Sequence, residues 1–394
     1  MSLNDTPLAN RIHIGIFGRR NAGKSSVINA MTGQSLAIVS DVAGTTTDPV
    51  LKAMELLPLG PVVIIDTPGL DDVGELGLMR VQKAYQILNK TDIAVVVIDG
   101  SVGMTEEDEK IIERIKAKNI PYVIVKNKMD LWEGEAEEKE NTISVSAATG
   151  QNIYELKELI GKLSPKEDDS RKIVSDLLQQ GDFVVLVVPI DSAAPKGRLI
   201  LPQQQTIRDI LEAGAVSIVT RDNELEQTLA SLGRRPRLVI TDSQIFGKVK
   251  KIVPDDVELT SFSILMARYK GDLETNVTGA RALENLQNGD KVLISEGCTH
   301  HRQCEDIGTV KMPRWIQEYT GKQLEFQFTS GTEFPADLSE YALIVHCGGC
   351  TLNEREMKYR LKCAEDQKIP MTNYGICIAY MNGILERSVR PLGL

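Results

Sequence analysis

The sequence lacks any long hydrophobic run. No uninterrupted apolar stretch in the chain approaches the roughly 20 residues that a membrane helix needs, so no spanning segment is expected. The N-terminal stretch MSLNDTPLANR contains neither an apolar core nor a cleavage site, so we expect no secretion signal and a cytoplasmic protein. A net charge of −10 disfavours broad nonspecific binding to nucleic acid. The sequence therefore predicts neither a membrane partner nor a nucleic-acid partner.

Two residue types are scarce, and both are concentrated in one part of the chain. There are six Cys and four His, and nine of these ten residues follow residue 297. In a chain without a secretion signal, thiols are more often metal ligands, catalytic or buried than joined in disulfides. The last quarter of the chain is therefore where metal chemistry is expected.

The length of 394 residues predicts two or three domains rather than one. Short apolar runs alternate with helical periods, which indicates an α/β fold built from βαβ units with parallel sheets. We expect one domain over 1–164, a small α/β domain over 172–262 and a third α/β domain over 263–394. The polar segment SPKEDDSR at 164–171 is typical of a linker. Strands are expected at Ile12–Phe17, Pro61–Ile65, Ile93–Ile98, Tyr122–Val125, Thr142–Val145, Phe183–Ile190, Ala215–Val219, Leu238–Thr241, Lys291–Ser295, Gln323–Phe328 and Tyr341–Val345.

The stretch GRRNAGKS at 18–25 matches the phosphate-loop pattern G-x-x-x-x-G-K-[ST]. It stands between an apolar strand, IHIGIF, and a predicted helix, which is the context that this motif requires. Its backbone N–H groups and the helix N-terminus would bind phosphate, Lys24 would neutralise the β- and γ-phosphates, and Ser25 would bind Mg²⁺. The nucleotide contacts predicted in this segment are Asn21, Ala22, Gly23, Lys24, Ser25 and Ser26.

A second motif, DTPG, directly follows the predicted strand PVVII. It places Asp66 where a carboxylate can act on the bound Mg²⁺, and Gly69 where a backbone N–H can contact the γ-phosphate. Lys24, Asp66 and Gly69 are therefore the predicted catalytic groups of a nucleotide hydrolase.

Two further motifs predict that the nucleotide is GTP. Asn127 and Lys128 begin the stretch NKMD after the strand YVIVK, and Asp130 ends it. The Asp130 carboxylate can accept hydrogen bonds from guanine N1–H and N2–H₂, which adenine cannot offer. Ser146 and Ala147 follow the strand TISV and would close over the base.

In order and spacing, these four motifs resemble the Era/TrmE-like group of GTPases, and the resemblance covers residues 10–163. In that group the stretch DVAGTTTD at 41–48 matches the first switch, in which a Thr reaches Mg²⁺. The resemblance therefore adds Thr46 and Thr47 as candidate Mg²⁺ ligands beside Ser25.

Two residues bear on the rate of hydrolysis. Leu70 follows DTPG, where Ras-type GTPases have a Gln that orients water. Asn21 lies in the phosphate loop, where similar GTPases use an Asn to help hold K⁺ in place of an arginine finger. We therefore expect slow, potassium-stimulated hydrolysis that drives a conformational switch.

The second group of candidate ligands has two halves, Cys298-Thr299-His300 and His346-Cys347-Gly348-Gly349-Cys350. Each half follows a predicted strand, and the carboxyl ends of neighbouring parallel strands converge on one crevice. Thiolates favour zinc and iron–sulfur centres. Zinc would take four ligands, namely three Cys and a His, whereas a 4Fe–4S cluster on three Cys would leave one iron open. The candidates for the fourth position are His300, His301, His346, Glu305 and Cys304.

The remaining Cys and His residues have structural interpretations. Cys363 and Cys377 lie within apolar helical patterns, which favours core packing for both. His13 lies in the first predicted strand and is expected to be structural.

A GTPase followed by a small α/β domain and a C-x-H…H-C-x-x-C domain resembles the family of FeFe-hydrogenase maturation GTPases, HydF. The resemblance spans essentially the whole chain and includes PKGRLILPQQQTIRDILEAG at 195–214 and FSILMARYKGDL at 262–273. Cys304 lies outside the shared motif, so the resemblance gives it no role.

This resemblance implies a scaffold or carrier. It implies a dimerisation domain over 172–262 and a cluster-binding domain over 263–394, in which Cys298, Cys347 and Cys350 hold a 4Fe–4S cluster. A diiron precursor assembled with the radical-SAM maturases HydE and HydG would be loaded there and delivered to apo FeFe-hydrogenase. The chain would form a homodimer or a higher oligomer and would use GTP, Mg²⁺ and K⁺.

Two other functions are weighed against this one. An Era-like GTPase in RNA or ribosome assembly with a structural zinc domain would carry the same motifs, but the acidic balance and the lack of a recognisable RNA-binding signature disfavour it. A GTP-dependent radical enzyme is disfavoured because the sequence contains no C-x-x-x-C-x-x-C motif.

Overall fold

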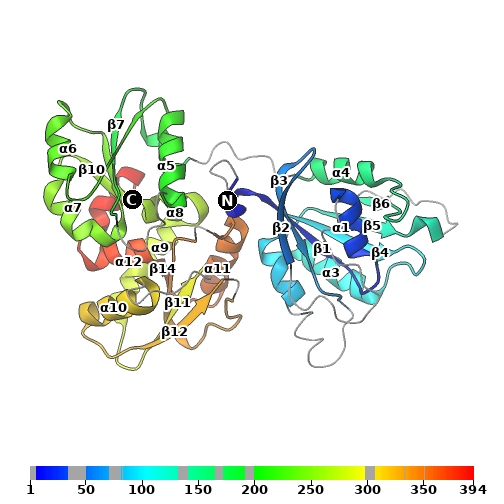
Figure 1. Ribbon diagram of the computed structural model, residues 1–394. Coiled ribbons are helices and arrows are strands. Elements are labelled where there is room, and N and C mark those ends of the chain that lie inside the picture. The colour runs from blue at the N-terminus through cyan, green and yellow to red at the C-terminus, as the bar shows by residue number, and fades with distance from the viewer. Residues whose placement is uncertain are drawn as a thin grey trace. The chain divides into compact units, whose positions relative to one another are not determined.

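Figure 1 shows a computed structural model of the chain. It describes residues 6–33, 50–70, 81, 83–131, 141–164, 172–190, 199–297, 307–331, 333–349 and 351–394. The chain divides into two compact units, Met1–Glu167 and Asp168–Leu394, each with its own sheets and core. Among the described residues, no helix combines the length and the apolar character needed to cross a membrane.

The first unit is built on a six-stranded sheet with the order β2-β3-β1-β4-β5-β6. Its strands are β1 (Ile12–Phe17), β2 (Val50–Leu56), β3 (Gly60–Asp66), β4 (Ile93–Asp99), β5 (Tyr122–Asn127) and β6 (Thr142–Ser144). Neighbouring strands are parallel except β2 and β3. The sequence predicts the five parallel strands but misses β2. This edge strand is largely exposed and carries Lys52 and Glu55, so it has no continuous apolar run.

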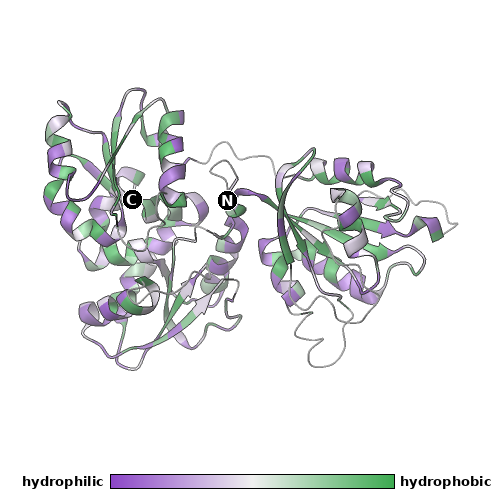
Figure 2. Ribbon diagram, in the orientation of Figure 1, coloured by the Kyte–Doolittle hydropathy of each residue, from purple (hydrophilic) through white to green (hydrophobic). Residues whose placement is uncertain are grey.

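The central strands of this sheet are buried on both faces. Residues 93–98 of β4 are at most 2% exposed. Helices α1 (Lys24–Thr32) and α4 (Ile153–Lys162) complete the core on one face, and α3 (Glu106–Ala117) contributes to the core on the other. Figure 2 shows these strands mainly in green and the helices in alternating green and purple. Burial on both faces explains why the strands appear in the sequence as continuous apolar runs.

The second unit contains two four-stranded sheets, with the orders β10-β9-β7-β8 and β12-β11-β13-β14. All neighbouring strands in both sheets are parallel. The strands are β7 (Phe183–Val187), β8 (Val216–Thr220), β9 (Leu238–Thr241), β10 (Glu258–Ser261), β11 (Lys291–Glu296), β12 (Glu325–Ser330), β13 (Tyr341–His346) and β14 (Met371–Asn373). The strands β10 and β14 were not expected from the sequence, because their short segments, ELTS and MTN, each contain a single apolar residue.

Helices connect and cover these sheets (Figure 1). They are α5 (Leu201–Glu212), α6 (Leu225–Ser231), α7 (Phe246–Ile252), α8 (Phe262–Lys270), α9 (Leu273–Ala280), α10 (Met312–Thr320), α11 (Glu354–Asp366), α12 (Tyr374–Met381) and α13 (Leu385–Val389). The last two return to the first of the two sheets, since Ile376 and Leu385 share a core with Val185 and Val239. Residues before and after the predicted domain boundary between 262 and 263 therefore pack into one unit. That boundary stays a prediction.

Candidate functional sites

The phosphate-binding loop joins β1 to α1. Gly23 has a φ of +91°, and a Cβ at this position would lie 2.1 Å from Asn127 Nδ2, so glycine is required. Lys24 Nζ donates to the carbonyl oxygens of Gly18 and Arg19, each at 2.9 Å. The ammonium is thus held against the loop, next to the helix N-terminus that favours phosphate. The other predicted contacts of this segment, Asn21, Ala22, Ser25 and Ser26, lie in the same turn or in the first turn of α1.

Asp66 ends β3 beside this loop, in register with Ile16 of β1. Ser25 Oγ donates to Asp66 Oδ2 at 3.4 Å, so the hydroxyl and the carboxylate expected to act on one Mg²⁺ lie together. Burial raises the pKa of Asp66 above its ordinary value, although Lys24 partly opposes this rise. A bound cation would favour the charged carboxylate. Gly69 follows in the loop after β3.

The residues predicted to bind the base lie at the carboxyl ends of β5 and β6. Asn127 is 2% exposed, donates to the Ala22 carbonyl at 3.1 Å and accepts from the Ala147 N–H at 3.1 Å. It therefore links the phosphate-binding loop to the loop that would close over the base. Ser146 Oγ donates to Asp130 Oδ1 at 2.5 Å, which orients the carboxylate expected to recognise guanine.

Other predicted residues of the first unit have different surroundings. Lys128 Nζ donates to Asp99 Oδ2 at 2.6 Å. Leu70 is 5% exposed and belongs to a hydrophobic core, so its side chain packs and cannot orient a water molecule. Thr46 and Thr47 lie outside the described residues.

One contact of the phosphate-binding loop was missed from the sequence. Arg19 Nε lies 3.4 Å from Asp108 Oδ2, whose side chain is completely buried. Asp108 also accepts from the Thr105 backbone N–H at 3.1 Å and from its hydroxyl at 2.8 Å, which caps α3. The Thr-x-x-Asp spacing could have indicated the cap. Nothing in the sequence connects Asp108 to Arg19.

The two halves of the Cys/His motif follow neighbouring strands. The expected parallel pairing of β11 and β13 is confirmed. The Gly297 N–H donates to Cys347 Sγ at 3.0 Å, and the Gly349 N–H donates to the same sulfur at 3.4 Å. Because Gly297 immediately precedes Cys298, the first of these bonds brings the start of the first half close to the first thiol of the second, while the other lies within the second half.

His346 has hydrogen-bonding partners at both ring nitrogens. Nδ1 lies 2.6 Å from the Cys347 carbonyl oxygen, and Nε2 lies 3.0 Å from Arg360 Nη1. A carbonyl only accepts and a guanidinium only donates, so Nδ1 carries the proton. Burial lowers the pKa of His346 to about 3, with a further contribution from the Arg360 charge. In this arrangement the imidazole is neutral and neither nitrogen is open to a metal.

Arg360, on α11, is a supporting residue that the motif analysis missed. It is fully buried and donates to Glu356 Oε1 at 3.0 Å, to Ser295 Oγ at 3.3 Å and to the Gly331 carbonyl at 2.7 Å. The spacing of Glu356 and Arg360 on a predicted helix could have indicated an ion pair. That Arg360 is buried next to the Cys/His motif follows only from the fold.

The six other candidate ligands of this motif lie outside the described residues. They are Cys298, His300, His301, Cys304, Glu305 and Cys350. Among the residues that are described, no three His, Cys, Asp or Glu side chains gather as a metal-binding group. A carboxylate that the sequence analysis passed over is Glu296, at the end of β11, where Tyr374 Oη donates to its Oε1 at 3.2 Å.

The remaining described Cys and His residues are buried or half-buried. Cys363 is half-buried beside a core cluster, and Cys377 is fully buried in another. Burial raises the pKa of Cys377 to about 12, so its thiol stays protonated. His13 is buried in β1, with Nδ1 at 2.8 Å from the Arg11 carbonyl oxygen.

Three protein families match separate parts of the chain. Residues 173–271 match the hydrogen maturase F dimerization domain, and residues 274–391 match the hydrogen maturase F tetramerization domain. Together these two matches cover more than half of the chain. The chain belongs to the hydrogen maturase F family. Residues 13–128 match the family described as 50S ribosome-binding GTPase, so the first unit of this maturase is a P-loop GTPase domain.

Individual relatives resemble the GTPase part of the maturase. GTPase Der of Wolinella succinogenes is 37% identical over 188 residues, which are 43% of the maturase and 39% of Der. The tRNA modification GTPase MnmE of Aquifex aeolicus is 37% identical over 155 residues, which are 38% of the maturase and 34% of MnmE. The matched region thus spans about two fifths or less of the length of these relatives.

Solved structures of GTPases also align with the maturase. Era of Aquifex aeolicus bound to GDP.AlF4- aligns at 23% identity and a TM-score of 0.36, covering 53% of the maturase and 92% of Era. The probable GTP-binding protein engB aligns at 23% identity and a TM-score of 0.31, covering 38% of the maturase and 97% of engB.

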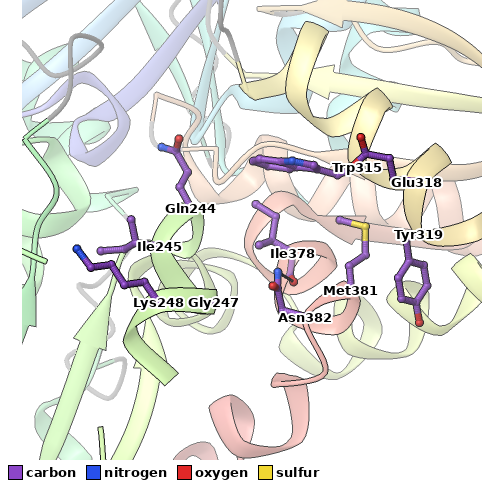
Figure 3. A pocket seen from close by; sticks show the side chains of 10 residues that line it. All are labelled: Gln244, Ile245, Gly247, Lys248, Trp315, Glu318, Tyr319, Ile378, Met381 and Asn382. Carbon is purple, nitrogen blue, oxygen red and sulfur yellow. Dashed lines mark hydrogen bonds between the residues drawn. The ribbon is translucent and has the colours of Figure 1, made fainter. Parts of the chain in front are cut away.

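A pocket of about 530 Å³ lies where the two maturase domain matches meet (Figure 3). One side is formed by the 3₁₀ turn Ser243–Ile245 and α7, and the other by α10 and α12. Figure 3 shows Gln244 and Ile245 on one side, and Trp315, Ile378 and Met381 on the other. This pocket is lined by residues other than those predicted to bind GTP or metal.

Proposed function

We propose that this maturase is a cytoplasmic, GTP-hydrolysing scaffold that binds a 4Fe–4S cluster and a diiron precursor and delivers the precursor to apo FeFe-hydrogenase. The observation that carries the proposal is the hydrogen bond from the Gly297 N–H to Cys347 Sγ, because it brings the residue that precedes the first half of the Cys/His motif to a thiol of the second half. Membership of the maturase family supports HydE and HydG as the partners that supply the precursor.

The described residues fit an iron–sulfur cluster at the carboxyl ends of β11 and β13. Two backbone N–H groups donate to Cys347 Sγ, and such donors favour the thiolate that a cluster needs. We assign Cys298, Cys347 and Cys350 as the three ligands. When bound, a cluster on three thiolates offers one iron with an exchangeable coordination position.

The fourth ligand belongs to the first half of the motif in this proposal. His346 uses one ring nitrogen for the Cys347 carbonyl and the other for Arg360, so binding iron would break one of these bonds. A buried guanidinium that loses its acceptor is costly. The candidates that remain are His300, His301, Cys304 and Glu305.

In the GTPase unit, we assign a role to each predicted phosphate, Mg²⁺ and guanine contact. Lys24 neutralises phosphate charge, while Ser25 and Asp66 act on Mg²⁺ from one corner of the site. The Gly69 N–H contacts the γ-phosphate. Asp130, oriented by its bond from a serine hydroxyl, accepts from guanine.

Hydrolysis is slow and potassium-stimulated in this proposal. The burial of Leu70 leaves its position without a group that orients water. Asn21 is exposed in the phosphate-binding loop with a φ of +60°, which leaves its amide oxygen accessible to K⁺. Thr46 or Thr47 supplies the hydroxyl of the first switch to Mg²⁺.

The potassium proposal is tested with Asn21→Ala and with Asn119→Ala as its control. Asn119 also has a left-handed backbone, with a φ of +49°, but follows α3. Wild type and Asn119→Ala should hydrolyse GTP faster in KCl than in NaCl, and Asn21→Ala should show equal rates. Equal rates for the wild type in the two salts would contradict the proposal.

We propose that the homodimer forms along the edge strand β8. Val216 and Val219 on this strand are 40% and 47% exposed, and Leu211 on α5 is 56% exposed. The opposite edge, β10, is packed against α13. An uncovered edge with exposed apolar side chains favours pairing with another copy. Val219→Lys should shift the mass measured by light scattering towards the monomer, and an unchanged mass would contradict this interface.

The carrier function is tested by transfer. The maturase is incubated with HydE, HydG and their substrates, purified, and then mixed with apo FeFe-hydrogenase. Hydrogen evolution should depend on this preloading. The absence of activity from preloaded, cluster-containing maturase would contradict delivery.

A further inference from the structure

Lys270 is the last residue of α8, a helix that precedes the sheet carrying the Cys/His motif. It is 4% exposed, which is unusual for a lysine. Its Nζ lies 3.4 Å from the Gly349 carbonyl oxygen and 3.3 Å from the Leu352 carbonyl oxygen. Both carbonyls belong to the loop that runs from Cys347 to α11, so one buried ammonium binds the loop at two points.

This loop is tightly turned where Lys270 meets it. Gly349 has a φ of +59°, and a Cβ there would lie 2.6 Å from Met357 Sδ, so the backbone is pressed against α11. Buried carbonyls in such a turn need donors. Lys270 supplies one donor group to two of them, which fixes the loop in the shape that also directs the Gly349 N–H to Cys347 Sγ.

A second buried cation contacts the residue that precedes the same loop. Arg360 contacts His346, which in turn donates to the Cys347 carbonyl. The Arg360 charge is paired with Glu356 at 3.0 Å. A 4Fe–4S cluster on three thiolates is anionic, and its negative charge increases on reduction. A buried ammonium nearby would therefore stabilise the reduced cluster more than the oxidised one.

We propose that Lys270 is a positioning residue for the iron–sulfur site: it binds the carbonyls of Gly349 and Leu352 and places a buried positive charge at the loop that follows Cys347. This inference rests on the proposed cluster-binding function. Lys270 lies in the stretch 173–271 that matches the dimerization domain, whereas the Cys/His motif lies in 274–391. The site is therefore supported by a residue outside the stretch that contains its proposed ligands.

The test compares Lys270→Met, Lys270→Gln and the control Lys250→Met in the full-length, reconstituted protein. Met removes the charge and the donor, and Gln removes the charge but keeps a donor. Lys250 lies in the same unit and also donates from Nζ to a backbone carbonyl, that of Asn382, at 2.6 Å. The readouts are the cluster midpoint potential, from a redox titration followed by EPR, and the rate of iron loss to a chelator.

Both Lys270 variants should shift the midpoint potential to more negative values, because each removes the positive charge. Lys270→Met should also lose iron about tenfold faster, the size of effect seen when a supporting residue of a metal site is removed. Lys250→Met should match the wild type. If Lys270→Met does not fold, the cluster midpoint potential of Lys270→Gln tests the inference instead. Wild-type potential and iron retention in a folded Lys270 variant would overturn the inference while leaving the proposed function intact. Zinc without iron in the wild type would overturn both.

Discussion

The GTP site and the Cys/His site obtain their support from different parts of the chain. In the GTP site several motif residues hold one another, as Asn127 does by bonding Ala22 and Ala147. Arg19 and Lys128 also reach carboxylates outside the motifs. In the Cys/His site the supporting cations, Lys270 and Arg360, lie outside the motif on two helices. A loop that binds phosphate through backbone groups can be encoded in one short stretch. An anionic cluster in a buried site would need compensating charge, and here the two cations come from elsewhere in the fold.

The largest effect on stability is expected for Arg360→Met. It leaves the Glu356 carboxylate buried and unpaired, which typically costs about 3–5 kcal/mol in the free energy of unfolding. Denaturant titration can follow the second unit through Trp315 fluorescence in a Trp132→Phe background, because these are the two tryptophans of the chain.

The same helix offers a matched control for this variant. Lys358 pairs with Glu354 at the same spacing, but the two side chains are 51% and 40% exposed. Lys358→Met should cost no more than about 0.5 kcal/mol. Equal losses for Arg360→Met and Lys358→Met would contradict a special role for the buried pair.

Lys24→Ala should affect the GTP site alone. It removes the ammonium that neutralises the phosphates, so GTP turnover should fall by about 10²–10³-fold, as when one transition-state donor is removed. Lys110→Ala is the control, because Lys110 forms an exposed pair with Glu106 on α3. Iron content should be unchanged in both variants. Loss of iron from Lys24→Ala would show that the two sites do not have separate support.

A smaller effect, on alkylation of the thiols, distinguishes the structural Cys377 from the predicted ligands. Burial raises the pKa of Cys377 to about 12, so only about one thiol in 10⁴ is ionised at pH 8. Iodoacetamide should leave Cys377 unmodified in the native protein and modify it in denaturant, as measured by peptide mass spectrometry. Equal modification rates in the two states would contradict its assignment to the core.

The parts of the molecule that were predictable from sequence are those whose signals are local. β1 and β9 have the predicted bounds because they are continuous apolar runs, and the phosphate-binding loop has a fixed spacing. β2 was missed because an exposed edge strand carries charged residues. Lys270 was missed because its partners, Gly349 and Leu352, are far away in sequence and offer only backbone carbonyls.

The hydrogen bonds that occupy both ring nitrogens of His346 could not have been predicted either. Its sequence position beside Cys347 suggested a ligand, whereas its ring nitrogens are engaged by the Cys347 carbonyl and by Arg360, a residue on a later helix. Sequence patterns thus indicate which residues can contact a ligand, and the fold decides which of them already have partners.

The central claim is that the two Cys/His loops hold an iron–sulfur cluster. It is tested by anaerobic reconstitution with iron and sulfide of the wild type, Cys347→Ser and Cys377→Ala, followed by metal analysis and EPR. The wild type and Cys377→Ala should contain a 4Fe–4S cluster, and Cys347→Ser should have lost it. Stoichiometric zinc without iron in the wild type, or a full cluster in Cys347→Ser, would contradict the account.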